Sequence, residues 1–96
     1  MDDTRHILDN PDASRFELWF GGTLSGVVEY RLTDETIAVL HVEVARDLRG
    51  QGVSEPFFDD VLAIIRDRGL QVRPICGWAR GQMHANPAHR DLLADT

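Results

Sequence analysis

The sequence contains no lysine, only one cysteine and no apolar run long enough to cross a bilayer. A single cysteine excludes a framework of intramolecular disulfides, so Cys76 is either a small buried side chain or a working thiol. The first residues are acidic and lack the basic flank and apolar stretch of a signal peptide. We therefore expect a cytoplasmic protein that has no membrane partner.

Positive charge is also scarce. Ten arginines stand against 16 acidic residues, and the formal net charge is -6. General nucleic-acid binding needs a basic surface that neutralises phosphate, so this composition argues against nucleic acid as a partner. The arginines are nevertheless concentrated in residues 48–96. That half contains six arginines and six acidic residues, whereas residues 1–47 contain four arginines and ten acidic residues. An anionic small ligand would be steered toward that half of the chain.

The length of 96 residues and the hydrophobic content of 43% predict one domain with a single modest core. The first dozen residues, which include Asn10-Pro11-Asp12, look loosely held. We therefore expect a flexible segment over residues 1–14 and a folded domain over residues 15–96.

Alternating apolar and polar residues predict three consecutive strands, over residues 15–20, 26–32 and 36–45. Short polar turns separate them, which suits an antiparallel meander. In the third strand, strict alternation places His41 and Glu43 on the same face as Ile37 and Val39.

A helix with two marked ends follows. Its apolar stripe runs over residues 55–68, with Ser54 as the expected N-cap, Pro56 in the first turn and Gly69 after the end. The remaining predicted elements are a strand over residues 69–77 and short helical segments over 79–85 and 88–94. The order β-β-β-α-β-α predicts a mixed α/β (α+β) domain with helices packed on a mostly antiparallel sheet.

The turn before the helix has the features of an anion site. The first N–H groups of a helix lack internal partners, and glycines let a ligand approach the backbone. Arg49 adds a cation and Ser54 a hydroxyl, so a pyrophosphate would fit; alternatively, the glycines only turn the chain. A Walker loop and a dinucleotide fingerprint are excluded, because Gly-Lys-Ser/Thr and the third glycine are absent. The residues of the turn are Arg49-Gly50-Gln51-Gly52-Val53-Ser54.

Three side chains carry reactive groups. Cys76 could act as a nucleophile if its thiolate were stabilised, although a lone cysteine at a strand end is commonly only packing. His41 could deprotonate an amine or pair with Cys76, and Glu43 could act likewise or orient the amine. Polar residues on one face of a strand need no function, so a structural role stays open for both.

Two further residue types are weaker candidates. His84 and His89 are separated by Pro87 and joined by no cluster of cysteines or carboxylates, so we predict no metal site. Trp19 and Trp78 could line a substrate mouth or belong to the core, and neither is assigned a role.

The turn of residues 49–54 resembles the Arg/Gln-x-x-Gly-x-Gly/Ala signature of the GNAT superfamily of N-acetyltransferases, and it has the same place between a strand and a helix. The segments 41–44 and 86–93, together with Cys76, are similar to short, single-cysteine members of that family. The resemblance runs from about residue 16 to residue 93. It implies a truncated GNAT-like fold in which two central strands splay apart and admit coenzyme A.

The resemblance also implies a site. Backbone near Val44 would hold the pantetheine arm of acetyl-CoA, and His41 and Glu43 would lie beside the thioester with Cys76 on the opposite wall. His89 would act as a general acid toward the departing thiolate. The residues implied to bind the pyrophosphate are Arg49, Gly50, Gln51, Gly52, Val53 and Ser54.

The activity implied by the resemblance is transfer of an acetyl group from acetyl-CoA to a primary amine, either directly or through Cys76. Asn86 and His89 stand where short relatives usually have histidine and tyrosine, so a coenzyme A-binding module without turnover is an alternative. A small interaction domain that does not bind coenzyme A is another. A half-open cleft in so short a chain could also gain from pairing as a homodimer.

Overall fold

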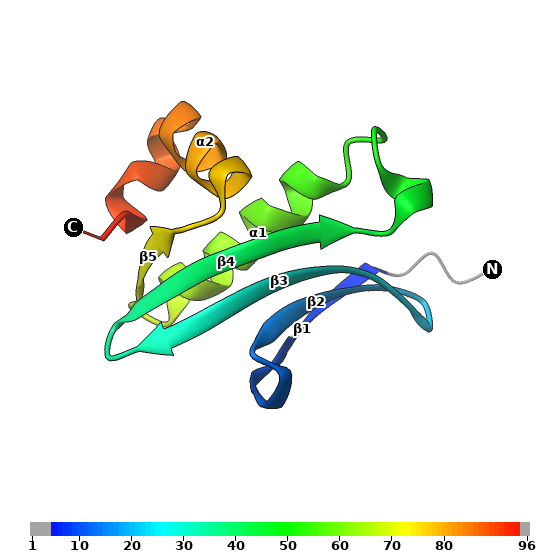
Figure 1. Ribbon diagram of the computed structural model, residues 1–96, viewed down its shortest axis with the longest axis horizontal. Coiled ribbons are helices and arrows are strands. Elements are labelled where there is room, and N and C mark those ends of the chain that lie inside the picture. The colour runs from blue at the N-terminus through cyan, green and yellow to red at the C-terminus, as the bar shows by residue number, and fades with distance from the viewer. Residues whose placement is uncertain (1–4, 95–96) are drawn as a thin grey trace.

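The computed structural model describes residues 5–94 and confirms a mixed α/β domain. Its strands form one sheet in the order β1-β2-β3-β4-β5 (Figure 1). The first four strands pair antiparallel, and β5 pairs parallel with β4. The strands are β1 (Arg5–Asn10), β2 (Arg15–Phe20), β3 (Thr23–Thr33), β4 (Thr36–Val44) and β5 (Gln71–Pro74). The helices are η1 (Pro11–Ala13), η2 (Arg46–Leu48), α1 (Ser54–Asp67), α2 (Gly77–Ala85) and η3 (Pro87–Leu92).

Residues 1–14 were expected to form a flexible segment, but from Arg5 onward the described part of it forms β1 and η1. Strand β1 pairs with β2 along its whole length, from Arg5 opposite Phe20 to Asn10 opposite Arg15. The Asn10 side chain then accepts from the N–H of Ala13 and starts η1. The observed order is therefore β-β-β-β-α-β-α, and residues 1–4 lie outside the described residues.

Helix α1 packs against one face of the sheet and forms the core with it. Its buried side chains recur every three to four residues, as an amphipathic helix requires. Full burial of such a side chain contributes roughly 1.5–3 kcal/mol relative to exposure. The helix lies close to the β3 backbone, because a Cβ added to Gly26 would come within 3.1 Å of the Phe57 ring. The buried residues of α1 are Phe57, Phe58, Val61, Leu62 and Ile65.

A bulge in β4 decides which way the predicted catalytic residues face. Leu40 is an extra residue between the paired positions of Val39 and His41. Strict alternation had placed His41 and Glu43 on the same face as Val39, which is buried. The extra residue reverses the alternation, so Val44 turns toward the core while His41 and Glu43 are exposed on the other face. This corrects the predicted division of faces.

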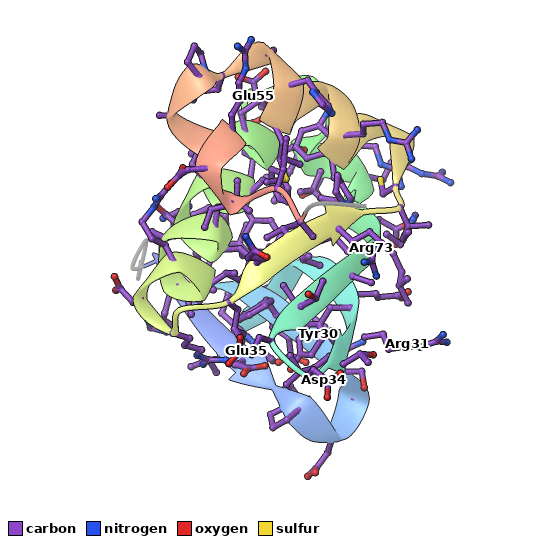
Figure 2. The ribbon with its side chains drawn as sticks, turned by 90° about the vertical axis from the view of Figure 1, so that its left-hand side faces the viewer. Tyr30, Arg31, Asp34, Glu35, Glu55 and Arg73 are labelled. Atoms are coloured by element: carbon purple, nitrogen blue, oxygen red, sulfur yellow. The ribbon has the colours of Figure 1, made fainter. Side chains whose placement is uncertain are left out.

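No helix among residues 5–94 covers that other face of the sheet. Arg31, Ala38 and Arg73 form one row across β3, β4 and β5. Figure 2 shows Arg31 and Arg73 projecting from the side away from α1. In the part of the chain that the structure describes, no helix is long and apolar enough to span a membrane.

Strand β5 is shorter than the predicted strand over residues 69–77. The N–H groups of Ile75 and Cys76 both donate to the carbonyl oxygen of Val39, at 2.9 and 3.0 Å, and the chain then enters α2 at Gly77. The turn into α2 therefore replaces the last part of the predicted strand.

Candidate functional site

The two parallel strands separate after Val39. That residue forms the last pair between the strands, with Pro74. Strand β4 then runs on to Val44, while the chain after β5 turns away toward α2 (Figure 1). In the described chain, no strand pairs with this side of β4 from Leu40 to Val44. The gap leaves an open strand edge in the middle of the molecule.

A cavity of about 310 Å³ lies along this open edge. Its walls come from β4, the loop after it, the start of α1 and the start of α2. An extended chain that carries amide groups can pair with such an edge through main-chain hydrogen bonds. The lining residues are His41, Val42, Glu43, Val44, Arg49, Ser54 and Trp78.

The glycines of the predicted anion-binding turn have a backbone reason to be glycine. Gly50 and Gly52 have φ angles of +78° and +73°, a region that residues with a Cβ rarely adopt. No atom lies within 4 Å of a Cβ added at either position, so the space in front of both residues is open. The Gln51 side chain between them holds the loop to η2, because its Nε2 donates to the carbonyl oxygen of Asp47 at 2.6 Å.

Helix α1 begins at Ser54 instead of being capped by it. Val53 already has helical angles, and its carbonyl oxygen accepts from the N–H of Phe57 at 3.2 Å. The Ser54 side chain makes no cap and lines the cavity. The N–H groups of Ser54 and Glu55 precede the first helical hydrogen bond, so they remain available to an anion at the positive end of the helix dipole.

An exposed cluster of charged groups lies at the same edge. The Nε2 of His41 is 3.5 Å from Oε1 of Glu43, and Nη2 of Arg49 is 3.9 Å from the same oxygen. All three side chains are more than half exposed. Exposed pairs at such distances contribute only about 0–1 kcal/mol to stability. The cluster is therefore not needed to hold the fold, and an imidazole beside a carboxylate can accept a proton from an amine.

Cys76 lies where the two strands separate. It is half-buried against the edge of the core and precedes the first residue of α2. It is not one of the residues that line the cavity, and among the described residues no hydrogen bond joins it to His41. The predicted pairing of thiol and imidazole is thus not formed in this structure.

His89 belongs to η3, and its side chain contacts α1. Its Nε2 is 2.9 Å from Oδ1 of Asp59 and 3.2 Å from Nδ2 of Asn86, and its side chain is only 13% exposed. The cavity beside β4 is lined by other residues. These contacts help to hold η3 against α1. The ion pair between Arg66 of α1 and Asp91 of η3 joins the same two elements.

Trp78 is a cleft residue to which the sequence assigned no role. Its ring meets that of Phe58 edge to face, with 5.4 Å between the centroids, and it forms part of the cavity wall. The signal that could have indicated it is a tryptophan at the start of a helix directly after the strand that ends at Cys76. Residues 5–94 contain no group of three or more His, Cys, Asp or Glu side chains that could hold a metal.

A sheet whose parallel strands part beside a glycine turn at a helix N-terminus defines a GNAT-like domain. The chain belongs to the GCN5-related N-acetyltransferase family, whose family model matches residues 15–92. The family predicted from the turn at residues 49–54 is therefore confirmed. A search of curated proteins finds no match.

Solved structures support the same fold. A GCN5-like protein from Staphylococcus aureus is similar over 100% of this chain and 93% of its own, with a TM-score of 0.73 and 20% identity. Ard1 from Thermoplasma volcanium is 20% identical with a TM-score of 0.54, over 69% of this chain and 45% of its own. An IAA acetyltransferase from Bacillus cereus is 19% identical with a TM-score of 0.54, over 62% of this chain and 41% of its own. Identities this low establish the fold alone.

Proposed function

We propose that this chain binds acetyl-CoA in the cavity beside β4 and transfers the acetyl group to a primary amine. The observation that carries the proposal is the open edge of β4, which ends at a glycine turn and a helix N-terminus. The pantetheine arm contains two amides in an extended chain, which suits pairing with backbone near Val44. The pyrophosphate then lies at the turn, where Arg49 and the first N–H groups of α1 supply donors.

His41 and Glu43 are the groups proposed to handle the proton of the acceptor. An amine attacks only when it is neutral, so a base beside the thioester must remove its proton. The new bond joins the amine nitrogen to the acetyl carbon, and the carbon–sulfur bond breaks. The ammonium proton passes to His41 before attack. The thiolate leaves with the electron pair and takes up the second proton that the nitrogen loses after attack.

Direct attack is the proposed route. A covalent route needs a base that activates Cys76, and in the described chain no hydrogen bond links its sulfur to His41. His89 is not proposed as the general acid, since its ring contacts Asp59 and Asn86. A cytoplasmic location remains a prediction.

We also propose a homodimer. The outer side of β1 has no strand partner among residues 5–94, so its backbone groups can pair with a second copy.

The test is calorimetric and thermal titration of the purified chain with CoA and acetyl-CoA. A ligand present at about 100 times its Kd stabilises the folded state by about 2.7 kcal/mol and should raise Tm by about 10 °C or more. Gly52→Asp, which adds a negative charge at the turn, should weaken binding by about 100-fold. Gly69→Asp is the matched control, because Gly69 has a similar φ of +71° at the far end of α1. It should lose stability and keep its affinity for CoA.

Activity is followed as release of free CoA thiol with a panel of amines. His41→Ala should lower kcat by about 100-fold, as expected for loss of a general base, and leave the Kd of CoA unchanged. Cys76→Ala should retain activity if attack is direct. Absence of CoA binding at millimolar concentration would overturn the proposal. Binding without turnover on any amine would instead favour a coenzyme A-binding module.

A further inference from the structure

A second cavity, of about 330 Å³, opens on the uncovered face of the sheet beside the first one. The two cavities share Glu43, Val44 and Arg49. A molecule bound in the second cavity would therefore meet the thioester proposed for the first. The charged residues of the second cavity carry both signs: Arg15, Glu29, Glu43, Arg46 and Arg49.

The negative part of this cavity flanks His41. Glu29 lies directly opposite His41 on the neighbouring strand, so the two side chains share the uncovered face. Glu43 lies two residues along β4 on the same face, 3.5 Å from the imidazole. One carboxylate thus neighbours the proposed base across the strands, and another neighbours it along β4. An ammonium group would be held there before it gives up its proton.

The positive part of the cavity lies toward η2, and its charge is only partly neutralised, because Arg15 is paired with Glu17 and Arg49 lies near Glu43. In the described chain, no hydrogen bond or ion pair joins the Arg46 guanidinium to another residue. Arg15 donates from Nε to Glu17 at 2.7 Å, and its terminal nitrogens make no further bond to described residues. These donors suit a carboxylate or another anion, and they repel an acceptor that carries only positive charge.

We infer that the acceptor of the proposed transfer is a small amino acid-like molecule, which carries an anionic group as well as its amine. The amine binds between Glu29 and Glu43 beside His41, and the anionic group binds to Arg46 with Arg15 at the margin of the cavity. This inference rests on the proposed function and adds the class of acceptor. The acetyl group moves from sulfur to the amine nitrogen, and no further reactant is required.

The experiment compares matched acceptors with acetyl-CoA. Free amino acids, the corresponding amino-acid amides and a diamine such as putrescine are assayed by release of CoA thiol. The amino acids should have a kcat/KM at least about tenfold above that of their amides, because one charge-assisted contact is lost in the amide. Arg46→Ala should raise the KM for amino acids by about tenfold and change the KM for amides little.

Arg31→Ala serves as the control, since Arg31 lies on the same face of the sheet but outside this cavity. It should leave both KM values unchanged. A preference for the diamine, with no effect of Arg46→Ala, would overturn the inference and leave the proposed function standing. An equal loss of CoA affinity in Arg46→Ala would also overturn it, since the guanidinium would then serve the cofactor.

An NMR titration separates this inference from the proposed function. Free amino acid should shift the backbone signals near Glu29 and Arg46 without CoA, whereas the amide should not. Such shifts in a chain that fails to bind CoA would support the site and reject acetyl transfer. Absence of shifts in a chain that does bind CoA would reject the site alone.

Discussion

At the scale of single residues, Glu17 is unusual because it is a buried charged side chain on the uncovered face of the sheet, only 5% exposed. Its carboxylate accepts from Nδ2 of Asn10 at 3.0 Å, Nε of Arg15 at 2.7 Å and Nε1 of Trp19 at 3.0 Å. The hydrogen bond from Asn10, followed by that from Arg15, lowers the pKa of Glu17, although burial acts in the opposite direction. Glu17 thus stays ionised and ties β1 to β2.

Glu17→Gln should lower the free energy of unfolding by about 1–3 kcal/mol at neutral pH, since charge-assisted hydrogen bonds are lost in a buried place. The folded pKa lies below the unfolded one, so this contribution is complete above the pKa of an unfolded glutamate, about 4.3, and is lost as pH falls through the folded value. Urea unfolding of both proteins over a pH series checks this. The difference between them should stay constant from neutral pH to about pH 5 and shrink below it; a difference that grows in acid would contradict the assignment.

At the scale of elements, the contact between β3 and α1 positions the site. Gly26 has little room for a side chain. A Cβ added there would lie 3.1 to 3.3 Å from the Phe57 ring, the Glu43 carbonyl oxygen and a Val44 methyl. The start of α1 is therefore fixed against the part of β4 that borders both cavities. A change of this contact should move the helix N-terminus relative to the open strand edge.

Gly26→Ala should destabilise the domain by about 1–3 kcal/mol through overpacking, and it should also weaken CoA binding. Gly22→Ala is the control, because no atom lies within 4 Å of a Cβ at Gly22. Urea unfolding and CoA titration of both variants measure the two effects. Equal stability of the two variants would show that α1 can shift without cost.

The elements also show what the sequence could and could not predict. The strand over residues 15–20 and the helix near 54–67 have strong periodicity and marked ends, so local pattern was enough. The bulge at Leu40 depends on pairing with β3, and an alternating apolar strand carries no local sign of it. Strand β1 was missed because a turn sequence follows it directly. The glycine turn was found, whereas Trp78 and Arg46 join cavities only through tertiary packing.

At the scale of the whole molecule, the two edges of the sheet differ. The outer side of β5 is bridged by Leu93, which pairs with Val72. Strand β1 lacks proline, lysine and any bulge, three of the features that protect an edge from pairing, although Arg5 and Asp9 carry charge on the face that they share with Ile7. In a two-fold antiparallel pairing centred on Ile7, Arg5 would lie opposite Asp9 of the second copy on the same face. The edge is therefore complementary to itself.

Leu8→Lys should convert the proposed dimer into a monomer, because Leu8 is exposed on the edge strand and a charge there opposes pairing. Leu24→Lys is the control: Leu24 is exposed on the uncovered face but lies away from this edge. Sedimentation equilibrium of the parent protein and the two variants shows whether the interface lies at the β1 edge or on the uncovered face. Dissociation caused by Leu24→Lys alone would place the interface on the face of the sheet, and a monomeric parent protein would reject the dimer.

The separation of β4 from β5 bears on how the proposed ligands enter and leave the domain. A complete sheet separates its two sides, but here β4 has an unpaired edge beside the cavity proposed for acetyl-CoA. If the two adjoining cavities hold the proposed donor and acceptor, each molecule has its own entrance, so neither blocks the entry or exit of the other. The proposed transfer would then need no moving lid to exchange the two molecules.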